Sequence, residues 1–308
     1  MTTNAIQSSH IYSTYFAPRG RSRIYTLGMQ IEQLYFSPFD QIIGFIGEAG
    51  SGKSVLIKGM FPGIELTNDD DGVNVRPLPL LEQEYETGFF TPHTYHLDIR
   101  FETGFHQLSE LADAVRLAVR RGKRIIIEHF DLIYPLLGVN ANLLIGVGEQ
   151  IVITRPNLFG PLPQELCDIV YPSLAYRLMA HSAEDLCEYA MTQEQMLACS
   201  HGDIRHGFVL EFNEHQPDID IPTLEARVNE LIRQDLPIDY YDESHILLGG
   251  AQHYCTGPRT HVRSTGRIIG FRLLDHFIYD HFHKTYMLVG CVGDDSEENI
   301  RKLETIHG

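Results

Sequence analysis

The chain has 308 residues, of which 41 are Asp or Glu and 24 are Lys or Arg, so its formal net charge is -17. Such an acidic surface repels polyanions, which excludes broad nucleic-acid binding, and a contact with tRNA would need a local basic patch. A hydrophobic content of 43% supports a buried core. The length predicts two domains, with one large α/β domain as the alternative.

Cysteine usage and hydropathy indicate the compartment. The 5 cysteines are scattered and odd in number, which argues against a disulfide framework and for a reducing environment. No apolar run is long enough to span a bilayer, and the first residues lack the charged and apolar regions of a signal peptide. We therefore expect a soluble, cytoplasmic protein without a membrane partner.

The first 40 residues contain a predicted helix and a basic stretch. Leu27, Ile31 and Leu34 recur at helical spacing, which predicts a helix in the second half of this segment. The basic stretch before it is Arg19-Gly20-Arg21-Ser22-Arg23. We expect this stretch to be a solvated turn, and a position near a bound nucleotide is the alternative.

Residues 47–54 match the phosphate-binding pattern GxxxxGK[ST]. They are Gly47-Glu48-Ala49-Gly50-Ser51-Gly52-Lys53-Ser54. The apolar residues 41–46 before them are typical of a buried strand, and residues 55–60 after them can open a helix. The glycines let backbone N–H groups turn toward phosphate oxygens, Lys53 can reach the outer phosphates, and the Ser54 hydroxyl can ligate Mg²⁺. The pattern predicts a site for ATP with Mg²⁺, and a Gly-rich turn with a chance lysine is the alternative.

An acidic segment follows a second apolar run at residues 64–67. It is Asn68-Asp69-Asp70-Asp71-Gly72. Adjacent carboxylates repel one another unless a cation or solvent offsets their charge, and ligands of α/β sheets gather at the carboxyl ends of strands. We therefore expect this segment near Mg²⁺ and a substrate hydroxyl, with an exposed turn as the alternative. Residues 73–106 are rich in Pro and aromatic residues and predict an ordered excursion over the sheet.

A helix and several strands are predicted next. Residues 107–121 have the apolar spacing of an amphipathic helix. Residues 124–131 form an apolar strand that ends in acid, where Glu128 is the first candidate to orient Mg²⁺ or its water and Asp131 the second. Strand-like runs at residues 143–147 and 150–154 complete an alternation that predicts a parallel sheet with right-handed crossovers.

Two arginines are further candidates for phosphate contact. Arg155 follows the last of these strands, and Arg177 lies on the next helical stretch. Each could stabilise a transferring phosphate, and a surface ion pair is the equal alternative.

Taken together, these segments resemble the uridine-kinase and phosphoribulokinase branch of P-loop proteins. The resemblance rests on the phosphate loop, Thr67-Asn68-Asp69-Asp70-Asp71, the stretch from Pro92 to Asp98, and Ile126-Ile127-Glu128. It implies that Asp69 and Asp70 position the acceptor hydroxyl and that Glu128 acts with Mg²⁺. The chain departs from that branch at His129, where a Gly is expected, and in lacking an arginine-dense lid helix.

The second half contains a different ordered set of motifs. They are RHGFVLEF at residues 205–212, PTLE at 222–225, VNELIRQDLP at 228–237 and CTGPRTHVRSTGRIIGF at 255–271. In this order they resemble the second additional domain of threonyl- and alanyl-tRNA synthetases. The resemblance implies an α+β fold for this part of the chain.

In that family a metal site is built from a helical His-x-x-x-His pair and from the Cys and His of the last motif. The resemblance assigns His181, Asp185, Cys255 and His261 to such a site. All four are legitimate Zn²⁺ ligands, although an Asp replaces the second histidine and the Cys-to-His spacing is six residues rather than four. A degenerate domain without metal is the alternative. The other nearby histidines are His201, His206 and His253.

We therefore expect a two-domain protein, with a P-loop parallel sheet and flanking helices in residues 1–175 and a synthetase-editing-like α+β domain in residues 176–308. The first functional hypothesis is Mg²⁺-dependent phosphoryl transfer from ATP to a small hydroxylated acceptor such as a nucleoside. Its catalytic set is Lys53, Asp69, Asp70 and Glu128. The second hypothesis is a tRNA-linked protein that binds or hydrolyses misacylated tRNA under nucleotide regulation. The third is a nucleotide-driven switch or metal-handling protein.

Overall fold

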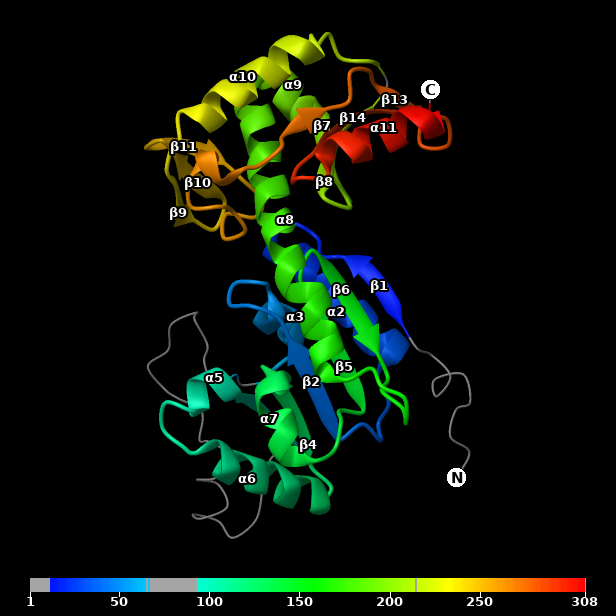
Figure 1. Ribbon diagram of the computed structural model, residues 1–308, viewed down its shortest axis with the longest axis vertical. Helices are drawn as coiled ribbons and strands as arrows, with labels where there is room; N and C mark the ends of the chain where they lie inside the picture. Colours follow the sequence, from blue (N-terminus) through cyan, green and yellow to red (C-terminus); the bar gives the residue numbers. More distant parts are fainter. Residues whose placement is uncertain (1–11, 65, 67–92, 214, 308) are drawn as a thin grey trace. The chain divides into compact units, whose positions relative to one another are not determined.

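The computed structural model describes residues 12–64, 66, 93–213 and 215–307. The chain forms two compact units (Figure 1). Unit 1 comprises the described residues up to Ala17 together with Arg21–Pro172, and unit 2 comprises Pro18–Gly20 together with the chain from Ser173 onward. The 28-residue helix α8 (Pro163–Ala190) contributes to both. Within the described ranges, no helix has both the length and the apolar character needed to cross a membrane.

Unit 1 is built on a six-stranded mixed sheet with the order β1-β6-β5-β2-β4-β3. Its strands are β1 (Ser13–Phe16), β2 (Ile42–Ile46), β3 (Thr94–Asp98), β4 (Arg124–Glu128), β5 (Leu143–Val147) and β6 (Gln150–Thr154). Strands β3, β4, β2 and β5 run parallel, whereas β6 pairs antiparallel with β5 and β1 pairs antiparallel with β6. The prediction of a parallel sheet is therefore wrong at this edge. Only Gly148 and Glu149 separate β5 from β6, and so short a connection permits a hairpin but no crossover.

Helices cover both faces of this sheet, because β2 is buried and apolar on both sides. They are α2 (Arg21–Tyr35), α3 (Lys53–Met60), α5 (Ile99–Glu102), α6 (Leu108–Arg120), α7 (Phe130–Leu137) and the first part of α8. Ile43 and Phe45 share a core with α2 and α3, whereas Ile42 and Ile46 share another with α6, α7 and α8. Alternate side chains of a strand point to opposite faces, so β2 anchors both layers. Figure 1 shows β2 in the middle of this unit, with α3 following it.

Several helices and strands predicted from the sequence can be compared with the described part of unit 1. The helices predicted in the first 40 residues and over residues 107–121 are confirmed as α2 and α6. The strand predicted over residues 124–131 is confirmed only as far as Glu128, because Phe130 begins α7. Ile64 lies outside any strand, and residues 65 and 67 lie outside the described residues. The excursion predicted for residues 73–106 is wrong where the structure describes it, because Thr94–Asp98 forms the parallel strand β3 beside β4.

Unit 2 combines helices with antiparallel sheets. One sheet has the order β12-β14-β8-β7, with β13 paired to β14, and the other has the order β11-β10-β9. The strands are β7 (Cys199–Ile204), β8 (Gly207–Asn213), β9 (Ile238–Asp242), β10 (His245–Leu248), β11 (Ala251–Tyr254), β12 (Arg272–Leu273), β13 (Ile278–Asp280) and β14 (Thr285–Cys291). The helices after α8 are α9 (Gln193–Ala198), α10 (Ile221–Arg233), the short η1 (Thr265–Arg267) and α11 (Ser296–His307). Their common core packs Ala183 and Leu186 of α8 against Phe208 of β8 and Leu224 of α10.

Candidate functional site

The loop between β2 and α3 contains residues 47–54 and has the backbone that its glycines permit. Gly52 precedes α3 with φ 94°, a left-handed conformation that side chains with a Cβ rarely adopt. A Cβ on Gly47 would lie 2.5 Å from the Val147 carbonyl oxygen. Ala49 and Gly50 at the tip are exposed. The loop is thus a tight strand-to-helix turn whose tip faces solvent.

Lys53 folds back over this loop. Its Nζ atom donates to the carbonyl oxygens of Gly47 at 3.1 Å and Glu48 at 2.9 Å, and it lies 3.6 Å from Glu128 Oε2. The side chain is buried. Burial lowers the pKa of Lys53, and the carboxylates of Glu128 and Asp98 counteract this effect. The ammonium group therefore lies where the loop backbone and the end of β4 meet.

Glu128 at the end of β4 receives contacts from two elements, α3 and β3. The Ser54 hydroxyl donates to Glu128 Oε1 at 3.0 Å, and His96 Nε2 lies 3.1 Å from the same oxygen. Burial would raise the pKa of Glu128, but its contacts with His96, Lys53 and Ser54 outweigh burial and hold the pKa at about 2. Glu128 is thus an ionised carboxylate beside a hydroxyl. Two such oxygens suit a hard cation such as Mg²⁺, so these residues fit the predicted metal.

Asp98 belongs to this cluster although the sequence did not single it out. It pairs in register with Glu128 on the neighbouring parallel strand, and its Oδ1 accepts from the Phe101 N–H at 3.1 Å at the start of α5. One ligand atom each of Asp98, Glu128 and His129 lies within 4.8 Å of the others. Burial raises the pKa of Asp98, which makes this carboxylate more basic than an exposed one. Residues 94–97 are Thr, Tyr, His and Leu, so no apolar run marks this acid, and the local signal is limited to the strand preference of Thr94 and Tyr95.

His129 follows Glu128 where the kinase resemblance expects a glycine. Its backbone has φ 57° and ψ 46°, which is the left-handed conformation that glycine adopts most easily. Burial lowers the pKa of His129 to about 4, with the positive charges of Lys53 and Arg100 adding to this effect. A neutral imidazole at pH 7 follows. The residue type differs from the expected glycine, but the backbone conformation is the one that glycine favours.

A second residue missed in the sequence is Arg100, in α5. Its Nη1 atom lies 3.0 Å from Oε2 of Glu48 in the phosphate loop, and both side chains are partly exposed. Neither side chain is buried, so the Arg100 guanidinium is accessible to solvent beside the loop.

The remaining predictions for unit 1 have different outcomes. Asp69 and Asp70 lie outside the described residues. Arg155 pairs with the buried Asp40 at 2.8 and 2.7 Å, and Asp40 precedes β2, at the opposite end of that strand from the loop. The prediction of Arg155 as a phosphate ligand is therefore wrong. The alternative of an ion pair is confirmed, but the pair is largely buried rather than at the surface. Asp131 Oδ2 accepts from the Tyr171 hydroxyl at 3.2 Å.

In unit 2, three of the four predicted Zn²⁺ ligands converge. His261 Nε2 lies 2.7 Å from Asp185 Oδ2 and 3.7 Å from Cys255 Sγ. The fourth, His181, is directed elsewhere, with Nδ1 3.0 Å from Thr260 Oγ1 and Nε2 3.7 Å from Asp203 Oδ1. The helical pair therefore contributes only its aspartate to the converging group.

The guanidinium of Arg19 lies among these ligands. Arg19 hydrogen-bonds to Glu184 and Asp185, and its Nη2 atom lies 3.1 Å from Cys255 Sγ. Its side chain is 2% exposed, so the solvated turn predicted from the sequence is wrong for this residue. Burial alone would lower the pKa of Arg19, but Glu184 and Cys255 outweigh burial and raise it. A charged guanidinium occupies the contacts that a metal would make, so these residues do not fit Zn²⁺ while Arg19 is present.

A second polar group surrounds Glu188 of α8, one helical turn after Glu184. His201 Nε2 lies 2.6 Å from Glu188 Oε1, and Cys199 Sγ lies 3.6 Å from the same oxygen. His253 Nε2 is 4.0 Å from Glu188 Oε2. Burial would lower the pKa of His201, but its hydrogen bond to Glu188 raises it. Two of the three other histidines named from the sequence thus lie beside the Glu188 carboxylate. The third, His206, stacks on Tyr176 at 3.7 Å between ring centroids, and its Nδ1 atom lies 2.9 Å from Asp295 Oδ2.

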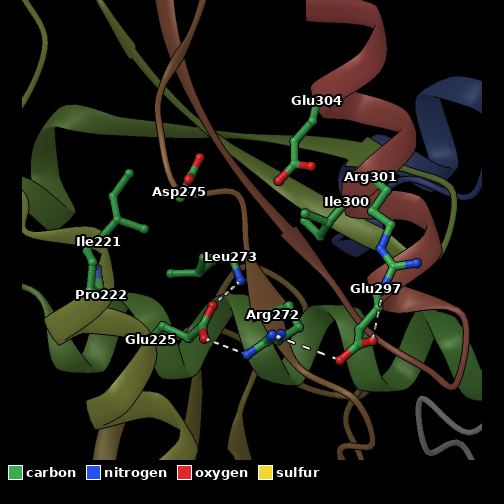
Figure 2. A pocket seen from close by; sticks show the side chains of 10 residues that line it. All are labelled: Ile221, Pro222, Glu225, Arg272, Leu273, Asp275, Glu297, Ile300, Arg301 and Glu304. Atoms are coloured by element: carbon green, nitrogen blue, oxygen red, sulfur yellow. Dashed lines mark hydrogen bonds and ion pairs between the residues drawn. The ribbon is translucent and has the colours of Figure 1, made fainter. Parts of the chain in front are cut away.

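Unit 2 also has a surface pocket of about 430 Å³ between α10, β12 and α11 (Figure 2). Arg272 contacts Glu225 at 3.3 Å and Glu297 at 3.9 Å, and Arg301 contacts Glu297 at 3.9 Å. The Leu273 N–H donates to Glu225 at 2.7 Å. These charges are engaged with one another across the pocket, and we assign it no chemistry.

No protein-family model matches this chain, and no curated protein matches it. Both resemblances seen in the sequence therefore stay hypotheses. The function proposed below therefore depends on the phosphate-loop pattern and on the geometry of the polar groups described above.

Proposed function

We propose that unit 1 binds ATP with Mg²⁺ at residues 47–54 and transfers a phosphoryl group to a small hydroxylated acceptor, such as a nucleoside. The observation that supports this most directly is the 3.0 Å contact between Ser54 Oγ and Glu128 Oε1 beside the buried Lys53. A strand-to-helix glycine loop, a lysine and a hydroxyl–carboxylate pair are the parts that phosphoryl transfer needs.

Each of these groups has a distinct role. The loop N–H groups and the amino end of α3 would hold the phosphates, with the positive end of the helix dipole adding to the attraction. Lys53 donates to two loop carbonyl oxygens, and it can exchange these neutral partners for phosphate oxygens. Ser54 and Glu128 would hold Mg²⁺, which when bound neutralises charge that develops on the phosphate oxygens.

The acceptor side would use the acids at the carboxyl ends of the parallel strands. Asp98 is the described candidate to accept the proton of the acceptor hydroxyl, because burial makes its carboxylate more basic. Asp69 and Asp70 stay sequence-based candidates for the same role. Arg100, which is partly exposed beside Glu48, would stabilise charge on the transferring group. Catalysis would then consist of positioning and charge stabilisation.

A substrate screen tests this proposal. ATP consumption by the full chain with Mg²⁺ should rise when a nucleoside or sugar is added, and should fall about 100-fold or more in Lys53→Met. Lys58→Met, on the same helix α3, is the matched control and should keep the activity. Slow hydrolysis that no acceptor increases would rule out phosphoryl transfer while leaving nucleotide binding intact.

Metal-dependent hydrolysis of misacylated tRNA, the alternative raised by the sequence, needs a cation held by Asp185, Cys255 and His261. Arg19 contacts two of these residues. We therefore do not propose hydrolysis for unit 2.

A further inference from the structure

We propose that Arg19 is a built-in cation that closes the Asp185–Cys255–His261 site of unit 2 to divalent metal ions. A neutral, smaller residue at position 19 would convert the same pocket into a zinc site. This inference concerns a different part of the chain from the phosphate loop, and its test does not depend on whether that loop binds a nucleotide.

The contacts of Arg19 coincide with those that a metal would make. A single atom, Nη2, touches both Asp185 Oδ1 and Cys255 Sγ, the latter at 3.1 Å. Nη1 of the same guanidinium contacts Glu184 Oε2. His261 Nε2 takes the other oxygen of Asp185 at 2.7 Å. A metal ion that bridged the carboxylate, thiolate and imidazole would need the position that Nη2 occupies.

The backbone on both sides of Arg19 is shaped for this insertion. Gly20 has φ +86°, and a Cβ there would lie 2.7 Å from the Thr256 carbonyl oxygen. On the facing loop, a Cβ on Gly257 would lie 2.9 Å from Arg19 Cγ. Both glycines let the two segments approach closely, so the insertion of Arg19 is a property of two separate stretches of sequence.

The loop after Cys255 makes hydrogen bonds that fix Cys255 and His181 in this arrangement. The Gly257 N–H donates to Cys255 Sγ at 3.2 Å, and Thr260 Oγ1 donates to the Gly257 carbonyl oxygen at 2.7 Å. His181 Nδ1 contacts the same Thr260 hydroxyl at 3.0 Å. The sulfur therefore accepts from an N–H group as well as from the guanidinium, and His181 is held away from the other three ligands.

Charge makes the guanidinium and a metal ion mutually exclusive. Arg19, Glu184 and Asp185 each expose 2% of their side chains, so solvent does not screen them. One guanidinium bridges the two carboxylates. A divalent ion placed among the same atoms would face a buried positive charge at contact distance, whereas removal of the guanidinium leaves two buried carboxylates without their counter-ion.

Zinc content that depends on Cys255 is the quantity to measure. Four proteins would be prepared, each with and without Cys255→Ser: the unsubstituted chain, Arg19→Ala, Arg19→Lys and the exposed control Arg23→Ala. Each would be equilibrated with Zn²⁺, dialysed and analysed for bound metal. We expect about one equivalent of Cys255-dependent zinc in Arg19→Ala and none in the wild type, Arg19→Lys or Arg23→Ala. Zinc that Cys255→Ser does not remove belongs to another group, such as Glu188–Cys199–His201, and agrees with the proposal.

Cobalt provides a second readout. Co²⁺ bound to Arg19→Ala should show a thiolate-to-cobalt absorption band that Cys255→Ser abolishes, and the wild-type chain should show no such Cys255-dependent band. Stoichiometric Cys255-dependent zinc in the wild-type chain would overturn the proposal.

Arg19→Gln is the control for a loss of folding in Arg19→Ala, because it keeps N–H donors but removes the charge. If Arg19→Ala folds only when Zn²⁺ is supplied, and Zn²⁺ no longer restores folding once Cys255→Ser is added, the proposal is supported. If Arg19→Ala and Arg19→Gln both fold and neither takes up Cys255-dependent zinc, the proposal is wrong.

Discussion

Each unit of this protein contains a buried cationic side chain close to carboxylates. The two differ in the hydrogen-bond partners that the side chain could exchange for a ligand. In unit 1, Lys53 donates to two neutral backbone carbonyls of a loop whose tip is exposed. In unit 2, Arg19 contacts the carboxylates of Glu184 and Asp185 in the interior. A phosphate group can compete for the contacts of Lys53, but it has no route to those of Arg19. We therefore propose a ligand site for the polar residues of unit 1, whereas those around Arg19 in unit 2 form an internal ion pair.

The largest effect expected from this contrast is on stability. Arg19→Ala leaves buried carboxylates without their cation, so the free energy of unfolding of unit 2 should fall by about 3–5 kcal/mol. Chemical denaturation in the presence of a chelator measures this loss. Arg23→Ala, at an exposed position of the same basic stretch, should change the unfolding free energy by less than about 0.5 kcal/mol. An equally small change in Arg19→Ala would show that the ion pair is not the constraint we describe.

The next effect is a pH dependence in unit 1. Contacts with His96, Lys53 and Ser54 outweigh burial and hold the pKa of Glu128 at about 2, below the ordinary value of 4.5. A carboxyl with a lowered pKa stabilises the folded state above pH 4.5, and the stabilisation is lost as the pH falls toward 2. The lowering corresponds to on the order of 3 kcal/mol.

Acid unfolding curves check this expectation. Stability of the wild-type chain should decline between pH 4.5 and pH 2, and Glu128→Gln should flatten that decline. Asp113→Asn, at an exposed carboxyl of the same unit, is the control and should leave the curve unchanged. A decline that persists in full in Glu128→Gln would show that other carboxyl groups control acid unfolding.

A smaller effect should separate function from stability beside the phosphate loop. The pair of Arg100 and Glu48 is about two-fifths exposed on each side, so it contributes little to folding. Arg100→Ala should leave the melting temperature unchanged and lower ATP turnover by about tenfold, because a phosphate contact is lost. Arg233→Ala, which removes another exposed arginine paired with a carboxylate, Glu230, should change neither quantity. Unchanged turnover in Arg100→Ala would remove this residue from the site.

Local patterns in the sequence predicted part of this picture. The order of apolar strand, glycine loop and helix around Lys53 is contained in about twenty residues, and an acid directly after the run Ile125–Ile127 marks Glu128. Asp98 also ends a strand, but no apolar run precedes it, and the Pro- and aromatic-rich composition of this segment favoured an excursion. The antiparallel direction of β6 was implied by a connection of only Gly148 and Glu149.

Arg19 could not be predicted from its neighbours. Its partners Glu184 and Cys255 follow it by 165 and 236 residues, so no local spacing links them. An arginine beside a glycine in a basic stretch has the composition of a solvated turn. What buries it is the charge of two carboxylates on α8 and the space beside Gly257, and both are visible only after folding. Three of the four residues that the resemblance assigned to a metal site converge, but the presence of Arg19 among them was not predicted.

Nucleotide binding by the intact chain is the measurement that tests the contrast between the two units most directly. Calorimetric titration with a non-hydrolysable ATP analogue and Mg²⁺ should show one site per chain. Lys53→Met should weaken that site by at least about tenfold, and Arg19→Ala at a temperature where it stays folded should leave the affinity unchanged. Absence of binding to the wild-type chain, or binding that Lys53→Met leaves intact, would contradict the assignment of the loop as the ligand site.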